Sequence, residues 1–517
     1  MAENIRLITL SKQYGRAFFA DCTSSFNPVQ LLDQDWWTRV SIEQCGHLDP
    51  GQRCGDVNCS PVRAINALDS DGMNAGELPT IEPFTDQFNA NLRNSTVSAS
   101  LSEFSSSLTV ETAFTVLAVA KQLKAQGKDV VELEIGDSPF DSTANAKTSG
   151  TAAIQNNVSH YCPSPGVPEF RSAAAKFVND EFNIPAEPSN IIAGPGAKVF
   201  EQFFCEAFLN PGDGCLVFSP YFPTYVPNIL RRQARPVFAP LRQSNEFRPS
   251  VSDIENFIAN DPSPKAIMLN SPHNPTGGIT TEDDLRDIAD LIRGKDIAVF
   301  SDEPYCHMVW KGRHHSILEQ PGMMDQAVAA YTFSKSYSMS GWRLGFCVTG
   351  DRIADAIGKM VNTTLSCTPA LVQLAGAAAL EKDSVERDEV MQKFREKVVL
   401  LTEGLNQIDG VHSLDPTSTF YVFPNVAPIC NRLGITSHGL ALYLLEGADD
   451  NFGVACLGGE CFGDAGHGFL RFSCAEPNER LQQALDFIPV AIGREDRIAA
   501  FLEQNPKFRL EQPYEVE

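Results

Sequence analysis

The chain has 517 residues, of which 43% are hydrophobic and 21% charged, and these proportions are typical of a globular protein rather than a disordered or membrane-embedded one. It carries 41 Lys and Arg against 65 Asp and Glu, and the resulting net charge of -24 repels phosphate backbones and anionic lipid surfaces. The length favours about two to four domains of roughly 100 to 200 residues each, and the charge disfavours nucleic-acid and membrane partners.

The N-terminal segment and the cysteines indicate in which cellular compartment the protein is expected. Residues 1–22 carry charged side chains within every short apolar stretch, whereas a secretory signal needs an uninterrupted apolar segment followed by small residues. No run of about 18 apolar residues occurs along the chain, so no membrane span is predicted. The 14 cysteines are scattered over a chain long enough to build its own core, and most are interpreted as free thiols. We therefore expect a cytoplasmic protein.

Residues 1–105 form an N-terminal extension of unknown fold, because long periodic segments are few and loop-forming Asn, Ser, Asp and Gly are frequent. The stretch CGHLDPGQRCGDVNC carries four side chains of the kinds that bind zinc: Cys45, His47, Cys54 and Cys59. Their spacing matches no established finger pattern. Ordinary thiols that pack in loops are therefore the preferred interpretation, and structural zinc is the alternative.

Regular structure is predicted from residue 106 onward. Within residues 106–150, TVETAFTVLAVAKQLKAQG has apolar residues at helical spacing and is followed by the strand-like VVELEIG. Within residues 151–370, amphipathic helices alternate with short apolar runs: NIIAG, GCLVFS, AIMLN, IAVFSD, AVAAYTFS and GFCVTG. Continuous apolar strands between helices indicate a mainly parallel sheet covered on both faces, which is a large α/β/α domain.

A smaller α+β domain is predicted for residues 371–492. A long helical stretch, ALVQLAGAAALEKDSVERDEVMQKFREKVVLLTEGLNQ, links it to the sheet domain, and the strand-like TFYVFPNV and GFLRFSC follow. Residues 106–150 are expected to contribute the first segment of this domain. Residues 493–517 are interpreted as a peripheral tail.

Polar residues follow three of the predicted strands, at the edge where ligands bind in parallel α/β sheets. AVAAYTFS runs into KSYSMSGWRLG, which places Lys335 directly after a strand. A lysine that is partly buried or close to another cation loses its proton more readily, and is then suited to form a Schiff base. Thr332, Ser334 and Arg343 supply hydroxyl and guanidinium donors for a phosphate group. The pattern therefore favours a nucleophilic lysine over a solvated surface residue.

Two further strand ends carry candidate site residues. Asp302 ends IAVFSD, and a buried carboxylate there would keep the nitrogen of a bound pyridine-ring cofactor protonated. Tyr305 would donate a hydrogen bond to a phenolic oxygen on the same ring. Asn274, in HNPTGG, offers its amide to the same oxygen. Taken alone, these residues also fit a solvated turn acid, a packing tyrosine and an asparagine in a strong turn sequence.

Four motifs together resemble a known family. SPHNPTGG, SDEPY, TFSKSYSMSGWRLGF and GFLRFSC occur in the order and at the spacing of the class I/II aminotransferases, the aspartate-aminotransferase-like enzymes of pyridoxal phosphate (PLP) fold type I. The resemblance covers about residues 107–490. It implies a PLP enzyme of the α/β class with a large, mainly parallel-sheet domain and a smaller α+β C-terminal domain.

The resemblance implies a role for each motif residue. Lys335 is expected to hold pyridoxal 5'-phosphate as a Schiff base and to carry a proton, and Asp302 is expected to pair with the pyridinium nitrogen. Asn274 and Tyr305 would bind the phenolic oxygen. Arg471, in FLRFS, would bind the α-carboxylate of the substrate with help from Asn274.

Other segments extend the resemblance to the phosphate and the subunit interface. AGPGAKVF is similar to the turn whose backbone N–H groups hold the phosphate at a helix N-terminus, and this turn would comprise Gly196, Ala197 and Lys198. Phe222 matches the ring stacked on the pyridine. Tyr161, in HYCPSPGVPEFR, matches the tyrosine that reaches the phosphate of the neighbouring subunit, which implies a homodimer with composite active sites. Gly136 matches the glycine turn that closes over the substrate, although IGDSPF departs from the family's usual LGEPDF.

The function implied is transfer of an amino group from an L-amino acid to a 2-oxo acid, with no metal involved. Relatives on the same scaffold instead act as lyases, cyclases, decarboxylases or oxidases of amino acids, and the sequence leaves these reactions open. A PLP-binding regulator or scaffold is the non-enzymatic alternative, and the acidic extension shows no helix-turn-helix pattern that would support it.

Overall fold

The computed structural model describes residues 6–9, 17–20, 99–108 and 111–515, and the chain divides into two compact units, residues 1–100 and 101–517. In the first unit, β1 (Arg6–Thr9) pairs antiparallel with β2 (Ala17–Ala20). The four side chains considered for zinc, Cys45, His47, Cys54 and Cys59, lie outside the described residues. All further description concerns residues 101–515, which begin with the short helix α4 (Glu103–Ser107).

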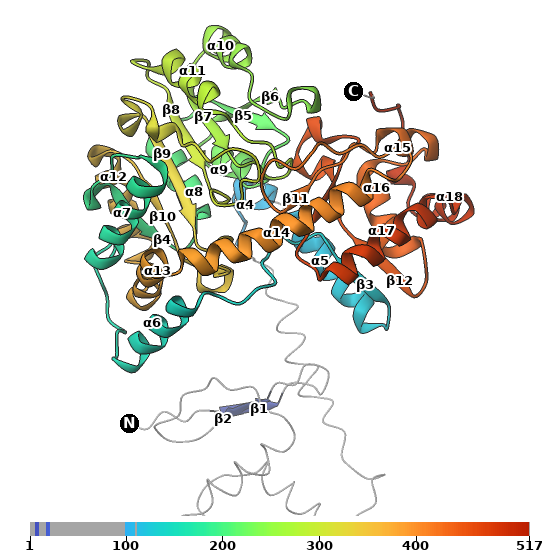
Figure 1. The fold of residues 1–517 in the computed structure, drawn as a ribbon, viewed down its shortest axis with the longest axis horizontal. Helices are drawn as coiled ribbons and strands as arrows, with labels where there is room; N and C mark the ends of the chain where they lie inside the picture. Colours follow the sequence, from blue (N-terminus) through green and yellow to red (C-terminus); the bar gives the residue numbers. More distant parts are fainter. Residues whose placement is uncertain (1–5, 10–16, 21–98, 109–110, 516–517) are drawn as a thin grey trace, which may run out of the picture. The chain divides into compact units, whose positions relative to one another are not determined.

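A seven-stranded sheet organises the first part of the second unit (Figure 1). Five neighbouring strands are parallel, and β10 runs antiparallel to both of its neighbours. The spatial order is β4 (Ile191–Gly194), β10 (Gly345–Val348), β9 (Ala327–Thr332), β8 (Ala298–Asp302), β7 (Pro264–Asn270), β5 (Gly214–Ser219) and β6 (Arg235–Pro240). The predicted mainly parallel sheet is thereby confirmed.

Both faces of this sheet are buried, because alternate strand residues enter two different cores. On β8, Val299 belongs to one core and Phe300 to the other. The first core is covered by α7 (Pro168–Phe182), α10 (Val251–Asn260), α11 (Glu282–Ile292) and α13 (Ala370–Lys382), with α6 (Ala144–Gln155) packed on α13. The second core is covered by α8 (Lys198–Phe208), α9 (Tyr225–Arg231) and α12 (Asp351–Leu365). This explains why the strands read as continuous apolar runs.

The predicted long helical stretch is divided at Asp383, and α14 (Ser384–Leu405) follows α13 after this break. The Asp383 carboxylate accepts hydrogen bonds from the backbone N–H groups of Asn145 and Ala146 at the start of α6. The side chain therefore caps one helix at the position where two others meet. From there α14 runs to the C-terminal part of the molecule (Figure 1).

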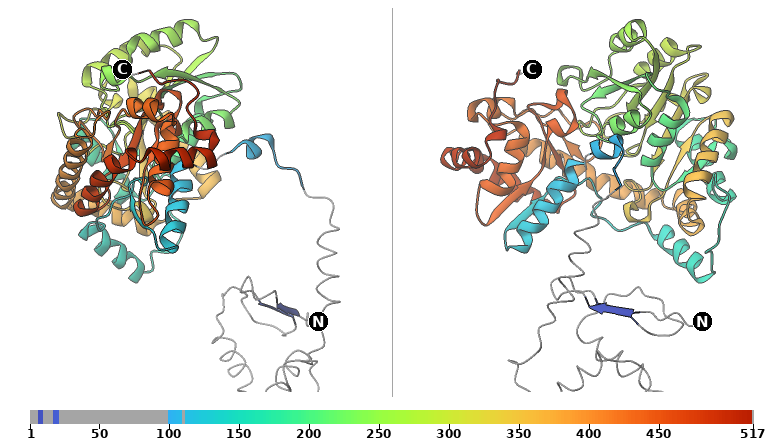
Figure 2. Two further views of the ribbon diagram at one scale, coloured as in Figure 1. Left: turned by 90° about the vertical axis from the view of Figure 1, so that its right-hand side faces the viewer. Right: turned by 180° about the vertical axis from the view of Figure 1, so that it is seen from behind.

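The C-terminal part combines a small antiparallel sheet with helices. The sheet has the order β11 (Tyr421–Val422), β14 (Leu470–Ser473), β13 (Leu457–Gly458). Beside it, β12 (Phe452–Ala455) pairs parallel with β3 (Asp129–Glu132), which follows α5 (Thr112–Ala125). The remaining helices are α15 (Ala427–Leu433), α16 (Ser437–Leu442), α17 (Asn478–Ile492) and α18 (Glu495–Gln504). Figure 2 shows α5 lying among these C-terminal elements, so the two ends of this unit build one α+β part.

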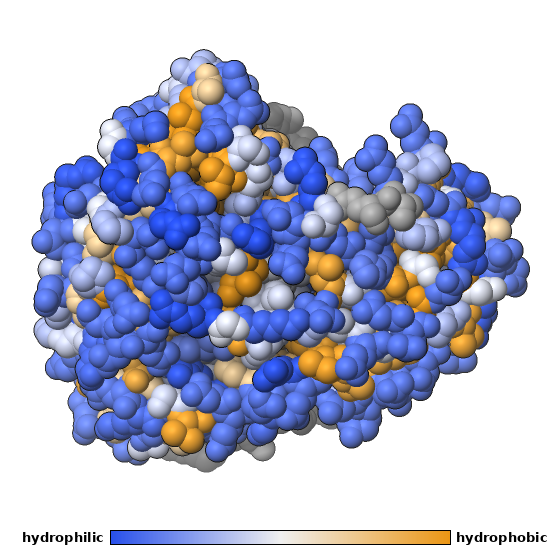
Figure 3. Space-filling model, turned by 45° about the horizontal axis from the view of Figure 1, so that its top comes forward, coloured by the Kyte–Doolittle hydropathy of each residue, from blue (hydrophilic) through white to orange (hydrophobic). Residues whose placement is uncertain are grey.

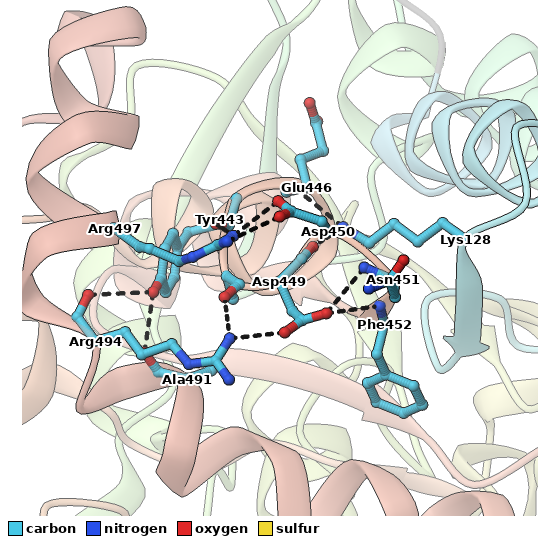
Figure 4. Close-up of polar contacts among 12 residues, drawn as sticks. Lys128, Tyr443, Glu446, Asp449, Asp450, Asn451, Phe452, Ala491, Arg494 and Arg497 are labelled. Atoms are coloured by element: carbon cyan, nitrogen blue, oxygen red, sulfur yellow. Dashed lines mark hydrogen bonds and ion pairs between the residues drawn. The ribbon is translucent and has the colours of Figure 1, made fainter.

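A polar network ties β3 to the turn before β12 (Figure 4). The Lys128 ammonium donates to the carbonyl oxygens of Glu446 and Asp449, at 3.1 and 2.7 Å. Arg494, which follows α17, donates to the Asp449 carboxylate at 2.9 Å, and this hydrogen bond is the main reason why the pKa of Asp449 falls to about 2. The network holds Lys128, the residue before β3, against the turn that precedes β12.

The face drawn in Figure 3 is predominantly hydrophilic, with hydrophobic residues in small separate groups. Among the described helices, none has the length and apolar character needed to cross a lipid bilayer.

Candidate active site

Three neighbouring strands, β7, β8 and β9, bring the predicted site residues to one edge of the sheet. Asn270 pairs with Asp302 across β7 and β8, and its side-chain amide donates to the Asp302 carbonyl oxygen at 2.8 Å. Asn274 follows β7, and Lys335 follows β9. The edge is the carboxyl end of the parallel strands, as the sequence predicted.

Asp302 lies buried at the base of this edge and accepts a hydrogen bond from the Tyr225 hydroxyl at 2.6 Å. Burial raises the pKa of Asp302 to about 7, and the Tyr225 hydrogen bond opposes this increase. A second buried carboxyl group, Glu201 of α8, accepts from the Thr224 hydroxyl, and its pKa is raised by burial and by the charge of Asp302. Lys198 and Lys335 oppose the increase in the pKa of Asp302 through their charges, but neither lysine forms an ion pair with Asp302 or Glu201 in the described part of the chain.

Lys335 points toward the loop that follows β3, where its Nζ donates to the carbonyl oxygen of Gly136. The ammonium lies 5.7 Å from the ring centre of Phe420 and 6.0 Å from that of Tyr305. The Tyr305 hydroxyl lies 3.3 Å from the Tyr421 hydroxyl. A Cβ atom on Gly136 would come within 1.7 Å of that Tyr421 oxygen, so the close approach of the loop requires glycine here.

The candidate phosphate cradle is built from the turn after β4 and the segment between β9 and β10. Gly196 has φ +91°, and a Cβ there would lie 2.6 Å from a guanidinium nitrogen of Arg343. Arg343 donates to the Pro195 carbonyl oxygen at 2.9 Å, and Thr332 donates to the Ser334 hydroxyl at 2.9 Å. Ala197 caps α8, so backbone N–H groups without helical partners face this turn.

Lys198 and Phe222 lie beside the cradle. The Lys198 ammonium forms an ion pair with the carboxylate of Glu111, the residue before α5. The same ammonium lies 5.1 Å from the ring centre of Phe222. The Phe222 ring contacts Tyr225 edge-on at 5.8 Å. The ring predicted to stack on a cofactor thus neighbours the tyrosine that contacts Asp302.

Arg471 is buried on β14 and faces the same region. It donates from Nη1 to Asn274 Oδ1 at 3.0 Å and from Nη2 to the carbonyl oxygen of Glu134. The guanidinium carbon lies 4.3 Å from the ring centre of Tyr421 and 5.0 Å from that of Phe462. Its Nε has no hydrogen-bond partner among the described residues, and a buried donor of this kind suits an anionic ligand.

The residues 128–488 match the family model for aminotransferase class I and II. The chain belongs to this family. It is 32% identical over 363 residues to the aspartate aminotransferase of Pyrococcus abyssi, which covers 69% of this chain and 90% of that protein. It is 30% identical over 367 residues to the aromatic-amino-acid aminotransferase 2 of Thermococcus litoralis, with 70% and 92% covered. The structure of Thermus thermophilus aspartate aminotransferase with maleate superposes with a TM-score of 0.71 at 27% identity, covering 76% of this chain and 100% of that one.

The expected family, fold type and enzyme class are thereby confirmed, and the protein is a PLP-dependent aminotransferase. All but one of the site residues predicted for this aminotransferase lie in or beside the segments described above. The exception is Tyr161, which is 88% exposed and forms no hydrogen bond or ring contact with the other predicted residues in the described part of the chain.

Residues that line this region but were not predicted from the sequence include Tyr225, Tyr421, Glu134 and Glu201. Tyr225 stands three positions after Phe222 in SPYFPTY, and its contact with Asp302 arises from the packing of α9 rather than from a local pattern. Glu134 is buried, and its carboxylate oxygens have no partner among the described residues. Burial raises its pKa to about 7.

Proposed function

We propose that this aminotransferase moves the amino group of an L-amino acid to a 2-oxo acid, with Lys335 as the residue that binds the cofactor and carries the proton. One observation carries the proposal: Asn274, after β7, contacts Arg471, while Asp302 ends the neighbouring strand β8 and Lys335 follows β9. A carboxylate-binding arginine, a lysine amine and a buried acid are thus available to one substrate.

The residues present fit pyridoxal 5'-phosphate. Asp302 has a raised pKa because it is buried, and a protonated ring nitrogen would give its carboxylate a direct ion-pair partner. Tyr305 and Asn274 would bind the phenolic oxygen, and Phe222 would cover the ring. The phosphate would be held by Gly196, Ala197, Lys198, Thr332, Ser334 and Arg343. When bound, PLP supplies an aldehyde that takes the amino group and a pyridinium ring that accepts the electron pair left at Cα.

The chain's own residues then bind and orient the substrate. Arg471 holds the α-carboxylate with its guanidinium fork, and Asn274 fixes the orientation of that fork. The Lys335 amine takes the proton from Cα as a general base. Gly136, whose carbonyl oxygen accepts from Lys335, lets the loop close over the substrate and exclude water. This reading favours transamination over the lyase, cyclase, decarboxylase and oxidase alternatives, since the relatives named above are aminotransferases.

The assembly and the compartment are part of the same proposal. Tyr161 places a large aromatic side chain in solvent, which supports a homodimer in which it reaches the phosphate site of a second copy. The cysteines in the described part of the chain are free, which suits the reducing cytoplasm.

Absorption spectroscopy tests the proposal. The purified protein is scanned between roughly 300 and 500 nm, alone and after addition of L-aspartate or an aromatic L-amino acid, with Lys335→Ala as the control. We expect a cofactor band that shifts to the amino form and is restored by a 2-oxo acid, and no such cycle in the variant. Release of ammonia or carbon dioxide without that cycle would replace transamination by a lyase-type reaction.

A further inference from the structure

The C-terminal tail lies beyond the residues matched by the family model and is fastened to the C-terminal part of the molecule. Leu510 donates its backbone N–H to the Gly434 carbonyl oxygen at 2.9 Å. Asn431, on α15, exchanges two hydrogen bonds with the backbone of Tyr514, at 2.8 and 2.9 Å. Tyr514 is thus held in one place.

The Tyr514 hydroxyl donates to the Glu460 carboxylate at 2.8 Å and accepts from the Ser437 backbone N–H at 3.2 Å. Burial and the charge of Glu460 both raise the pKa of Tyr514, so its hydroxyl stays a proton donor. The second carboxylate oxygen of Glu460 is buried and has no partner within the described chain. Among the described residues, the Glu460 carboxylate is therefore held by this one charge-assisted hydrogen bond, while the backbone carbonyl oxygen of Glu460 accepts from the Gly463 N–H at 3.3 Å.

Glu460 belongs to a loop formed by two 3₁₀ turns, η7 (Gly459–Phe462) and η8 (Asp464–Gly466), which we call the 459–466 loop. Gly459 and Gly466 pack so closely that a Cβ on Gly459 would lie 1.8 Å from the Gly466 carbonyl oxygen. The two turns are therefore expected to move together.

The 459–466 loop contacts both Arg471 and the segment that leads from β5 to Phe222. The Phe462 ring covers the Arg471 guanidinium at 5.0 Å, and the Phe462 carbonyl oxygen accepts from the Tyr221 backbone N–H at 2.8 Å. Tyr221 directly precedes Phe222. The Ala465 backbone N–H donates to the Ser219 hydroxyl at the end of β5, at 3.3 Å. A displacement of the loop would uncover Arg471 and loosen the contact with the sheet.

We propose that Tyr514 is a positioning residue for substrate binding, which acts through Glu460 to hold the 459–466 loop with Phe462 over Arg471. This inference rests on the proposed role of Arg471 as the α-carboxylate site. A ring that excludes water from the guanidinium strengthens its attraction for a carboxylate. Loss of the Tyr514 hydroxyl therefore weakens the binding of substrate more than the chemical step.

The test compares Tyr514→Phe with Tyr443→Phe in the PLP-loaded enzyme. Tyr443 is the matched control, because its buried hydroxyl donates to the Ala491 carbonyl oxygen at 3.0 Å in the same part of the fold, away from the loop. For Tyr514→Phe we expect KM for the amino donor to rise about three- to tenfold, with kcat changed by less than about twofold. We also expect faster hydrogen–deuterium exchange in peptides that cover residues 459–469. The control should change neither quantity.

A second pair of variants separates positioning from a loss of folding. Glu460→Gln keeps an acceptor for the Tyr514 hydroxyl and should stay close to wild type, whereas Glu460→Ala should reproduce the effect of Tyr514→Phe. An unchanged KM in Tyr514→Phe and Glu460→Ala overturns the inference, whether or not exchange is faster. If the wild-type enzyme showed no turnover, the proposed function itself would fail, which is a different result from turnover that is insensitive to Tyr514.

Discussion

The Tyr225 hydroxyl donates a 2.6 Å hydrogen bond to the buried carboxyl group of Asp302. The two side chains come from different layers, Tyr225 from α9 and Asp302 from the end of β8. The hydrogen bond favours the ionised form of Asp302, whereas burial favours the neutral form. Tyr225 therefore helps to keep the charge that a pyridinium nitrogen would require.

Replacement of Tyr225 by Phe should lower kcat about five- to fiftyfold. Asp302 then loses a donor to its ionised form, its pKa rises further, and the acid limb of the pH–rate profile moves to higher pH. The measurement is kcat against pH for wild type and variant. A profile that keeps its position would show that Tyr225 does not control the ionisation of Asp302.

The Asp302 carboxyl group should lower the stability of the cofactor-free protein as the pH rises. The folded-state pKa of Asp302 is about 7, above its unfolded value, so its contribution is fully present below about pH 4 and is lost between pH 4 and 7. Relative to Asp302→Asn, cofactor-free wild type should lose about 2 to 4 kcal/mol of unfolding free energy across this range. Urea unfolding of both proteins at several pH values measures the difference. Curves that run parallel contradict the prediction.

Gly136→Ala should abolish most activity while the fold remains. The added Cβ would lie 1.7 Å from the Tyr421 hydroxyl oxygen, so the loop that accepts from Lys335 must shift. We expect kcat/KM to fall at least about a hundredfold, with little change in Tm. Gly493→Ala is the control, because its nearest contacts of 3.5 Å are ordinary ones. Near-normal turnover in Gly136→Ala would mean that the loop does not close on the site.

Arg471→Lys should raise KM about a hundredfold or more, because a lysine ammonium cannot reproduce the two-pronged contact with a carboxylate. Arg480→Lys is a suitable control, since Arg480 makes a similar two-pronged contact with Asp129, at 2.7 and 3.0 Å, on the surface. Steady-state kinetics on both variants decide the point. Equal KM values for the two variants would remove Arg471 from the substrate site.

How far the sequence predicted the site depends on the element that carries each residue. Lys335, Asp302 and Asn274 were predictable because each ends or follows an apolar strand of a parallel sheet, and strand ends gather at one edge. Tyr225 was missed because its hydroxyl reaches Asp302 only through the packing of α9 on the core that contains Phe300. The contact between Gly136 and Tyr421 joins segments far apart in the chain, and no local pattern encodes it.

In the fold, too, local patterns predicted some features, whereas features that depend on contacts between distant segments were missed. The alternation of apolar runs and amphipathic helices predicted the sheet, but the antiparallel direction of β10 has no local signature. The break at Asp383 was missed because its carboxylate caps α6, which lies far away in the sequence. The role of Tyr161 at the phosphate site of a second copy of the chain stays a prediction.

The parallel pairing of β3 with β12 has a consequence for biosynthesis. The ribosome makes β3 before the seven-stranded sheet and β12 after it, so β3 waits without its partner while most of the chain emerges. During that interval Val131 and Leu133, which end up fully buried, have no core to enter. The nascent enzyme therefore carries an unpaired hydrophobic strand during most of its synthesis, and such a strand favours aggregation when synthesis is interrupted.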